Sequence, residues 1–376
     1  MPQLRYFTAG ESHGQCLIGI LEGLPAGLTI DLAAINRDLA RRQHGYGRGG
    51  RMKLEADQAE VLSGVRRDET IGSPVTVMIK NRDFKINELP AVTKPRPGHA
   101  DLAGVIKYDR QDARDILERS SARETTVRVA IGGVCKLLLA EVGVDIVGHI
   151  VSLGTVQAKT DGLTFAQIRE RSEASEVRCA DPDAEKKMIE AVDAAKGQGD
   201  TLGGVFEVVA IGLPIGLGSH VQWDRKLDAN LARALMSIQA MKGVEVGLGF
   251  EAARRFGSQV HDEILPAQEG VLTRAGNNAG GIEGGMTNGQ PVVVRVAMKP
   301  LSTLMKPMRS VDIQTGQEVK ATVERSDVCA TPAAAVIGEA VVAFELAKAL
   351  LDKFGGDSVR ELKRNVASYH EACKRW

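Results

Sequence analysis

The 376-residue sequence is poor in aromatic side chains, which make up 4% of it, while glycine reaches 41 residues. That combination favours tight turns and aliphatic packing over aromatic-lined pockets. Positive and negative side chains balance at 48 each, so no global field attracts nucleic acid or a membrane surface. We therefore expect neither of them as a partner.

The sequence also has little cysteine and no long apolar run. The five cysteines are odd in number and far apart, and no C-x-x-C pair occurs among them. This argues against a zinc site or a disulfide framework and favours a reducing compartment. No apolar run approaches the roughly 18 residues of a membrane helix, and the first residues lack a signal-peptide pattern. The sequence predicts a cytoplasmic protein with no metal.

Helix-like and strand-like patterns alternate along the chain. Helical spacing occurs at 31–43, 122–143, 181–199, 223–243 and 331–356, with Asp31 and Asp181 placed as N-caps. Short β-rich runs lie between them, at 16–23, 73–80, 144–154, 203–214 and 291–298. No Pro/Ser-rich linker, low-complexity block or tandem repeat divides the sequence. These patterns predict an α+β fold in a single compact domain over residues 1–376.

Four conspicuous irregular segments lie between these elements, and the first of them is rich in both glycine and charge. Such segments add little to a core and are typical of functional loops. They cover residues 41–53, 93–104, 277–291 and 299–307.

The stretch Gly10-Glu11-Ser12-His13-Gly14 matches the nucleophile elbow G-x-S-x-G. An α/β-hydrolase needs several strands before its elbow, and only nine residues precede Gly10. The context therefore argues against Ser12 as a triad nucleophile. Two interpretations stay open: a structural glycine turn, and a turn that exposes His13 as an acid/base or phosphate-binding group.

The segment from Gly45 to Gly50 fits G-x-G-x-x-G, but it follows a helix, whereas a dinucleotide fingerprint must follow a strand and open a helix. The positive charge around this segment is more informative. Five cations lie within thirteen residues: Arg41, Arg42, Arg48, Arg51 and Lys53. Either these cations form a solvated basic loop, or they clamp an anion, since arginine forks bind carboxylate and phosphate bidentately.

Two further segments combine cations with groups that can transfer a proton or bind phosphate. In "KPRPGHAD", Arg96, His99 and Asp101 lie in a stretch stiffened by two prolines, which suits proton transfer to an anionic substrate. In "ERSSARETTVR", serines 120 and 121 could cap a helix, or the helix start could bind phosphate between two arginines.

Taken together, these segments resemble the chorismate synthase family, in the family's order and spacing. The resemblance covers almost the whole chain, from about Arg5 to the final helix. The stretch between Lys80 and Thr93 is shorter than in family members that carry an insertion there. The resemblance therefore does not give the shape of the rim of the site, although it does give the chemistry. The matching segments are GESHG, RRQHGYGRGGRMK, RPGHAD, RSSARET, GDTLGGVFE, GLGSHVQWDRKLD, NNAGGIEGGMTNGQP, KPLST and RSDVCA.

The resemblance implies a β-α-β sandwich, with helices enclosed between sheets, that assembles as a homotetramer. It implies anti-1,4-elimination of phosphate from 5-enolpyruvylshikimate-3-phosphate to give chorismate, the last common step of the shikimate pathway of aromatic amino acid biosynthesis. The family requires reduced FMN although no net redox change occurs. Whether NADPH reduces the flavin on this chain or a separate flavin reductase supplies it stays open.

The resemblance also implies roles for individual residues. His13 would protonate the departing phosphate, and His99 would protonate the reduced flavin. Asp327, in RSDVCA where many members have RHDPC, would assist deprotonation at flavin N5, with Ser12 as a candidate relay. The anion-binding residues, for substrate or NADPH, would be Arg42, Arg48, Arg51, Arg96 and Arg123. The FMN contacts would be Arg119, Ser120, Ser121, Gln239, Ala240, Gly284, Lys299, Pro300, Leu301, Ser302, Thr303 and Arg325.

Two other functions remain as alternatives. Arginine-glycine segments can bind single-stranded RNA together with aromatic side chains, but only Tyr46 is interleaved here and the net charge is zero. The second alternative, an NADPH-dependent flavin reductase, overlaps the function that the chorismate synthase resemblance implies, and the sequence does not separate the two.

Overall fold

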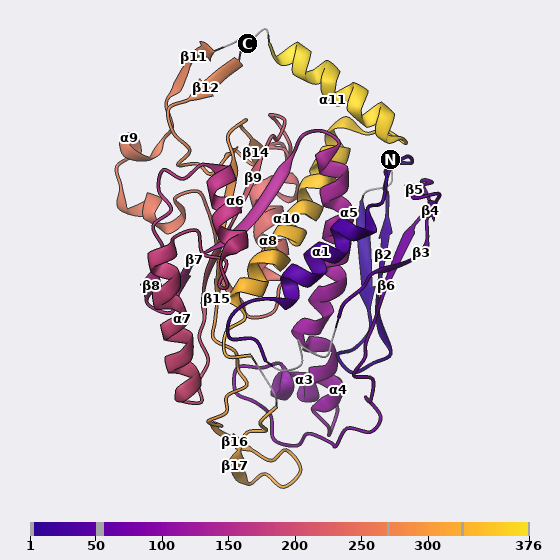
Figure 1. The fold of residues 1–376 in the computed structure, drawn as a ribbon, viewed down its shortest axis with the longest axis vertical. Coiled ribbons are helices and arrows are strands. Elements are labelled where there is room, and N and C mark those ends of the chain that lie inside the picture. Colours follow the sequence, from indigo (N-terminus) through magenta and orange to yellow (C-terminus); the bar gives the residue numbers. More distant parts are fainter. Residues whose placement is uncertain (1–3, 50–55, 269–270, 325–326, 375–376) are drawn as a thin grey trace.

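Two antiparallel sheets enclose a layer of helices in the computed structural model, which describes residues 4–49, 56–268, 271–324 and 327–374 (Figure 1). The first sheet has the order β1-β2-β6-β3. Its inward face is apolar because alternate residues of β6, Val75, Val77 and Ile79, are fully buried. Its strands are β1 (Arg5–Ala9), β2 (Cys16–Glu22), β3 (Glu60–Ser63) and β6 (Val75–Lys80).

The second sheet has the order β10-β15-β9-β7-β8. Its central strands are buried almost continuously, since helix α10 (Thr331–Phe354) and helix α6 (Phe165–Ala174) both pack on β7. The strands are β7 (Asp145–Leu153), β8 (Val156–Gln157), β9 (Gly204–Ile211), β10 (Met241–Val246) and β15 (Val292–Met298).

The helical layer between the sheets is centred on α5 and α10, which pack closely on each other. A Cβ atom added at Gly132 of α5 would lie 2.3 Å from the Cβ of Ala340, so the close approach requires glycine there. Helix α5 also contacts β2 and β6, while α10 contacts β7 and β9. The main helices of this layer are α1 (Leu32–Gln43), α5 (Thr125–Ala140), α8 (Leu227–Met236) and α10 (Thr331–Phe354).

This layering is the β-α-β sandwich that the resemblance implies, so the expected fold is confirmed. The remaining helices are α3 (Asp101–Tyr108), α4 (Arg114–Ser120), α7 (Pro182–Gly197), α9 (Gly257–Val260), α11 (Val359–Cys373) and the 3-10 turns Ala122–Glu124, Trp223–Arg225 and Gly249–Arg254. The short strand pairs are β4 (Val65–Arg66) with β5 (Glu69–Thr70), β11 (Ile264–Gln268) with β12 (Val271–Arg274), β13 (Ile282–Glu283) with β14 (Met286–Thr287), and β16 (Arg309–Val311) with β17 (Glu318–Lys320).

Most of the expected elements are confirmed, including the caps. The Asp31 side chain accepts a hydrogen bond from the backbone N–H of Ala34, and Asp181 accepts two at the start of α7. The expected helix at 223–243 is too long, because α8 ends at Met236 and strand β10 begins at Met241. Ala240, with φ +70°, turns the chain between them. The loop expected at 93–104 likewise ends where α3 begins.

Within the part of the chain that the structure describes, no helix combines the length and the apolar character needed to cross a membrane. The same residues contain no cluster of three His, Cys, Asp or Glu side chains arranged to hold a metal ion.

Candidate active site

His13 lies in the turn between β1 and β2 and is held by a carboxylate from α4. Its Nδ1 atom is 3.0 Å from both carboxylate oxygens of Glu118, and its backbone N–H donates to Glu118 Oε2 at 2.9 Å. The backbone N–H of Ser12 donates to the Glu118 carbonyl, and the Ser121 hydroxyl lies 3.3 Å from the Ser12 hydroxyl. The GESHG turn is therefore fixed to the α4–α5 junction, with the imidazole in a defined orientation.

Glu118 is almost completely buried and remains ionised. Burial alone would raise the pKa of this carboxyl group, but the hydrogen bonds from His13 and then from Arg114 lower the pKa below its usual value. Arg114 Nη1 lies 3.2 Å from Glu118 Oε1. On the other side of the imidazole, His13 Nε2 is 3.6 Å from Asp83 Oδ2.

Three of the predicted arginines form a cluster with two carboxylates, in which Arg48 and Asp327 are partly exposed and the other members are buried. Arg123 Nη1 donates to Asp57 at 2.7 Å, and Arg48 Nη1 pairs with Asp327 at 2.8 Å. Asp327 also accepts a hydrogen bond from the backbone N–H of Gly49 at 2.6 Å. Arg42, which is 4% exposed, donates to the hydroxyl of Thr125 and to a backbone carbonyl at the start of α5. Arg42, Arg48 and Arg123 are thus not part of a solvated basic loop.

In the part of the chain that the structure describes, this cluster sets three arginines against two carboxylates, a balance that suits an anion. Burial lowers the pKa of the Arg42 guanidinium; Asp57 raises it, and the neighbouring cations Arg48 and Arg123 lower it again. Among the described residues, the buried Nη1 atom of Arg42 has no hydrogen-bond partner, and its ion pair with Asp57 spans 3.9 Å. A bound carboxylate or phosphate would relieve both the repulsion and the missing hydrogen bond.

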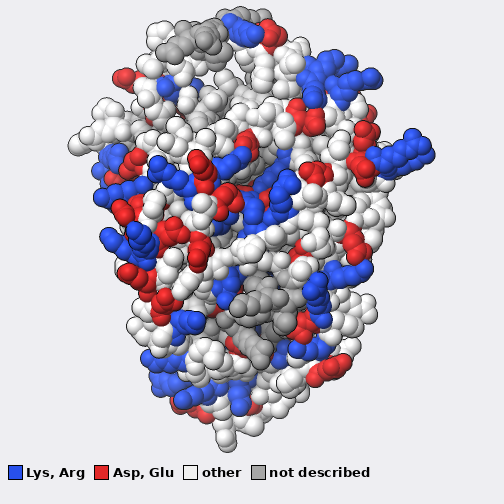
Figure 2. Space-filling view, viewed as in Figure 1, with Lys and Arg blue, Asp and Glu red and all other residues white. Residues whose placement is uncertain are grey.

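Arg41 does not belong to this cluster, although the sequence placed it with the other cations. Its guanidinium binds Glu339 of α10 through two hydrogen bonds, at 2.7 and 2.8 Å, and also pairs with Asp38 and Glu173. Figure 2 shows Lys and Arg side chains interleaved with Asp and Glu across the middle of the face that it draws. The anion clamp expected from the loop is therefore divided between two separate networks.

His99 also has a buried carboxylate at Nδ1. The distance from His99 Nδ1 to Asp101 Oδ1 is 2.5 Å, and Arg96 donates to the same carboxylate from Nε at 2.8 Å. Burial would raise the pKa of Asp101, but the bonds from His99 and Arg96 hold it well below the usual range. Arg96 Nη1 donates to the Thr303 hydroxyl at 2.9 Å, which joins this loop to the segment containing Lys299.

Several predicted flavin contacts are linked to each other through Thr8 and Glu124. Arg119 donates to the backbone and hydroxyl oxygens of Thr8, and the Thr8 hydroxyl donates to Glu124 at 2.8 Å. Gln239 donates to the other oxygen of Glu124 at 3.4 Å. The next residue, Ala240, accepts a hydrogen bond from the backbone N–H of Lys299. Contacts therefore connect the RSSARET and KPLST segments.

Two side-chain atoms among these residues are buried without a hydrogen-bond partner in the described part of the chain: Ser120 Oγ and Gln239 Oε1. A buried polar atom left unpaired costs free energy, so a ligand that forms hydrogen bonds with these two atoms would remove that cost. Ala240 adds a strained backbone, since a non-glycine residue rarely adopts φ +70°. These features fit a cofactor that binds beside Ser120, Gln239 and Ala240.

The structure does not bring every predicted flavin contact close to Ser120, Gln239 and Ala240. Gly284 is exposed in the β13–β14 turn, beside His220, and no described contact joins it to the other predicted residues. Leu301 accepts a hydrogen bond from Thr201, and Ser302 lies against Gly98, next to His99. The exposed Pro300 follows Lys299. Arg51 and Arg325 lie outside the described residues.

Sequence reasoning missed the carboxylates that organise the site. Glu118 stands in the quoted segment "ERSSARETTVR" but received no role, and Asp57 lies outside every motif. An acidic residue directly before the RSSARET segment was the one available signal. Nothing in the sequence pairs Glu118 with a histidine 105 positions earlier.

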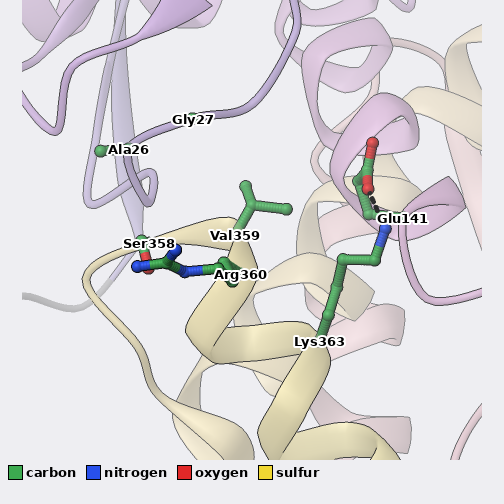
Figure 3. Close-up of a pocket in the computed structure, with 7 residues that line it drawn as sticks. All are labelled: Ala26, Gly27, Glu141, Ser358, Val359, Arg360 and Lys363. Carbon is green, nitrogen blue, oxygen red and sulfur yellow. Dashed lines mark hydrogen bonds and ion pairs between the residues drawn. The ribbon is translucent and has the colours of Figure 1, made fainter.

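One surface pocket of the described residues lies away from these clusters. Figure 3 shows it between the Gly27 turn, the end of α5 and the start of α11, with Lys363 pointing to Glu141. The distance between Lys363 Nζ and Glu141 Oε2 is 2.7 Å. None of the residues that line this pocket belongs to the clusters described above, so it is not the candidate active site.

Comparison with known proteins gives one consistent family. A family model described as chorismate synthase matches residues 4–351. The chain is similar to proteins named chorismate synthase from Geobacter sulfurreducens, at 59% identity over 98% of both chains, and from Symbiobacterium thermophilum, at 57% identity over 99% of this chain and 100% of the relative. A crystal structure of chorismate synthase matches with a TM-score of 0.84 and 44% identity over 100% of both chains. With matches of this extent and identity, the chain belongs to the chorismate synthase family of lyases.

Proposed function

We propose that this chain converts 5-enolpyruvylshikimate-3-phosphate to chorismate by anti-1,4-elimination of phosphate and a ring proton. This is the last common step of the shikimate pathway. The observation that carries the proposal is the arginine cluster beside the His13 turn. Asn81 joins the two, because its side chain accepts a hydrogen bond from Arg123 and donates to the Gly14 carbonyl at 2.8 Å.

The substrate carries two carboxylates and a phosphate, so its site needs several cations in fixed positions. Arg42, Arg48 and Arg123 are held by carboxylates and hydroxyls on separate elements, which keeps their guanidinium groups in place before a ligand arrives. We assign His13 to protonate the departing phosphate. We assign Asp327, held between Arg48 and the Gly49 N–H, to assist removal of the ring proton, with Ser12 as a relay.

We propose reduced FMN as the cofactor, bound beside Ser120, Gln239 and Ala240. When bound, it would supply an electron-rich ring that stabilises positive charge developing as phosphate leaves. The unpaired Ser120 Oγ and Gln239 Oε1 atoms support the proposal because a cofactor's polar groups would satisfy both. His99, whose Nδ1 is engaged by Asp101, would hold or release a proton on its other nitrogen near the flavin. The remaining proposed contacts are Arg119, Ser121, Gly284, Lys299, Pro300, Leu301, Ser302, Thr303 and Arg325.

We further propose that the protein works as a homotetramer in the cytoplasm, and that its flavin is reduced either by NADPH on this chain or by a separate reductase. The reducing compartment is supported by the five cysteines, all of which are free. The tetramer follows from the family, and light scattering of the purified protein tests it.

The decisive experiment mixes the protein with reduced FMN and substrate under anaerobic conditions. We expect phosphate release together with a transient change in the flavin spectrum, and no net oxidation of the flavin. Oxidised FMN without reductant should support no turnover. Full turnover in air with neither flavin nor reductant would contradict the proposed function. Salt-dependent RNA binding without flavin binding would instead favour a role for the arginine loop in RNA recognition.

A further inference from the structure

We infer that Glu118 is a positioning residue that keeps one proton on Nδ1 of His13, so that Nε2 is the nitrogen that protonates the departing phosphate. This inference rests on the proposed function of His13 as a general acid. It assigns a role to a side chain that no sequence motif singled out.

The geometry around Nδ1 leaves one arrangement of the proton. Both Glu118 oxygens lie 3.0 Å from Nδ1, within hydrogen-bond distance. An ionised carboxylate only accepts hydrogen bonds, so Nδ1 must carry the hydrogen in both the neutral and the protonated ring. The bond from the backbone N–H of His13 to Glu118 Oε2 fixes the carboxylate and the backbone of the histidine together.

Glu118 is kept ionised and in place by its own neighbours. Its side chain is 2% exposed, and Arg114, four residues earlier on α4, pairs with it at 3.2 Å. The lowered pKa of Glu118 agrees with this arrangement. A buried, ionised carboxylate that accepts hydrogen bonds from both the ring and the backbone of a histidine holds that histidine in one tautomer and one orientation.

The Nε2 side of the ring is less constrained. Asp83 Oδ2 lies 3.6 Å from Nε2, beyond ordinary hydrogen-bond distance, while Asp83 Oδ1 pairs with Lys85 at 2.7 Å. The backbone N–H groups of Lys85 and Ile86 both donate to the carbonyl of His13. The 81–86 segment thus holds the backbone of His13, and its longer contact to Nε2 leaves Nε2 the more weakly engaged of the two ring nitrogens.

The proton transfer is balanced on this chain and the substrate alone. In the protonated ring both nitrogens carry hydrogen. As the carbon–oxygen bond to phosphate breaks, the Nε2–H bond breaks and an O–H bond forms on the leaving phosphate. The ring becomes neutral imidazole with its hydrogen on Nδ1, still donating to Glu118, and Nε2 takes a proton from solvent before the next turnover.

The test combines a tautomer measurement with kinetics on the full-length protein. The protein is labelled with ¹⁵N-histidine, and the His13 signals are identified by their loss in His13→Ala. In the neutral ring we expect hydrogen on Nδ1 and none on Nε2. In Glu118→Gln we expect both tautomers, because a carboxamide can donate as well as accept. We expect kcat to fall about 100-fold, at the lower end of what a positioned general acid contributes, with little change in KM.

Two further variants separate positioning from folding. Glu118→Asp keeps the charge and should retain more activity than Glu118→Gln. Glu207→Gln is the matched control, since Glu207 is a buried carboxylate 3.0 Å from Nε2 of the buried His149 in the second sheet. It should lower stability and leave kcat unchanged.

Each outcome decides the inference. Hydrogen on Nε2 of neutral His13 in the parent protein overturns it, whatever the variants do. A folded Glu118→Gln with parental kcat also overturns it. If Glu118→Gln does not fold, the parent spectrum and Glu118→Asp decide. If the parent releases no phosphate with reduced FMN and substrate, the proposed function fails instead, while the tautomer measurement still tests the Glu118 contact.

Discussion

At the scale of single residues, Arg48 is the arginine whose removal should separate substrate binding from flavin binding. Arg48→Ala should weaken substrate binding tenfold to a hundredfold, because one charge-assisted contact contributes about 1.5–3 kcal/mol. FMN binding should weaken less, since Arg48 belongs to the arginine cluster assigned to the substrate anions, whereas the flavin is proposed to bind beside Ser120 and Gln239. Anaerobic calorimetric titration of the folded variant measures both dissociation constants.

Arg37→Ala is the control for this experiment. Arg37 is an exposed cation on α1 whose nearest described ion pair, with Asp31, spans 3.9 Å. Its removal should leave the substrate dissociation constant unchanged. An unchanged constant in Arg48→Ala as well would show that Arg48 does not bind the substrate and that its pair with Asp327 is structural.

The two histidines should fail in different ways, because their carboxylate partners place them in different clusters. His13→Ala should slow phosphate departure, and His99→Ala should change the spectrum and protonation of bound reduced flavin. Each should lower turnover by about 10²–10⁴-fold, the usual loss for a general acid, while ligands still bind. Rapid-mixing measurements of phosphate release and flavin absorbance distinguish the two steps. A near-normal kcat in either variant would show that the histidine concerned has only a structural role in its loop.

The sequence could predict the reactive side chains but not the groups that orient them. His13, His99 and the arginines stand in short segments whose chemistry is local. Glu118 and Asp57 act on residues far away in the sequence, at separations of 105 and 66 positions. Such pairs are set by tertiary packing, so they became visible only once α4 and the residues after α1 were placed beside the β1–β2 turn.

At the scale of elements, Glu339 connects three helices. This fully buried carboxylate in α10 accepts hydrogen bonds from Arg41 of α1 and Lys136 of α5, and from the backbone N–H of Gly148. Burial would raise the pKa of Glu339, but Lys136 and Arg41 hold it far below the usual range. The carboxylate therefore stabilises the helical layer only while it is ionised.

Glu339→Gln should consequently lower the free energy of unfolding by about 3–5 kcal/mol at pH 7, since it leaves buried cations without their partner. A depressed pKa in the folded state gives stability that is fully present above the unfolded value, about 4.3, and is lost progressively as the pH falls from there towards the lower folded value. The difference between parent and variant should thus shrink towards pH 3. Urea unfolding of both proteins across this range measures it.

The exposed pair of Glu141 and Lys363 supplies the control. Glu141→Gln should change stability by less than about 1 kcal/mol at every pH, as surface ion pairs do. A Glu339→Gln effect that is equally small, or independent of pH, would contradict the role of Glu339 as an ionised link between the helices.

Elements with local signals were predicted well. Asp31 and Asp181 cap their helices, and the five β-rich runs are all strands. The exception is the segment after α8, where helix-forming residues continue past Met236 but the chain turns at Ala240 and pairs with β15. Here the pairing of β10 with β15, about fifty residues later in the chain, overrides the local preference for helix. The residues next to β10 in the sequence give no sign of this distant partner.

At the scale of the whole molecule, the order of strands in each sheet could not be read from the sequence. Strand β6 lies between β2 and β3, and β15 lies between β9 and β10, so neighbours in the sheets are distant in the chain. Only the resemblance to a family supplied the layering. The same arrangement has a consequence for stability, because the candidate site takes residues from the β1–β2 turn, the helical layer and the loop after β15.

We therefore expect folding and flavin binding to be linked over the entire chain. One buried apolar cluster includes Leu17 and Val77 of the first sheet, Val134 of α5, and Phe206 and Val294 of the second sheet. The chain should unfold in a single calorimetric transition, as one domain does. Reduced FMN at 100 times its dissociation constant should raise the free energy of unfolding by about 2.7 kcal/mol, since it binds only the folded state. Two transitions, with only one of them shifted by FMN, would show that the sheets fold separately and that the site belongs to one half.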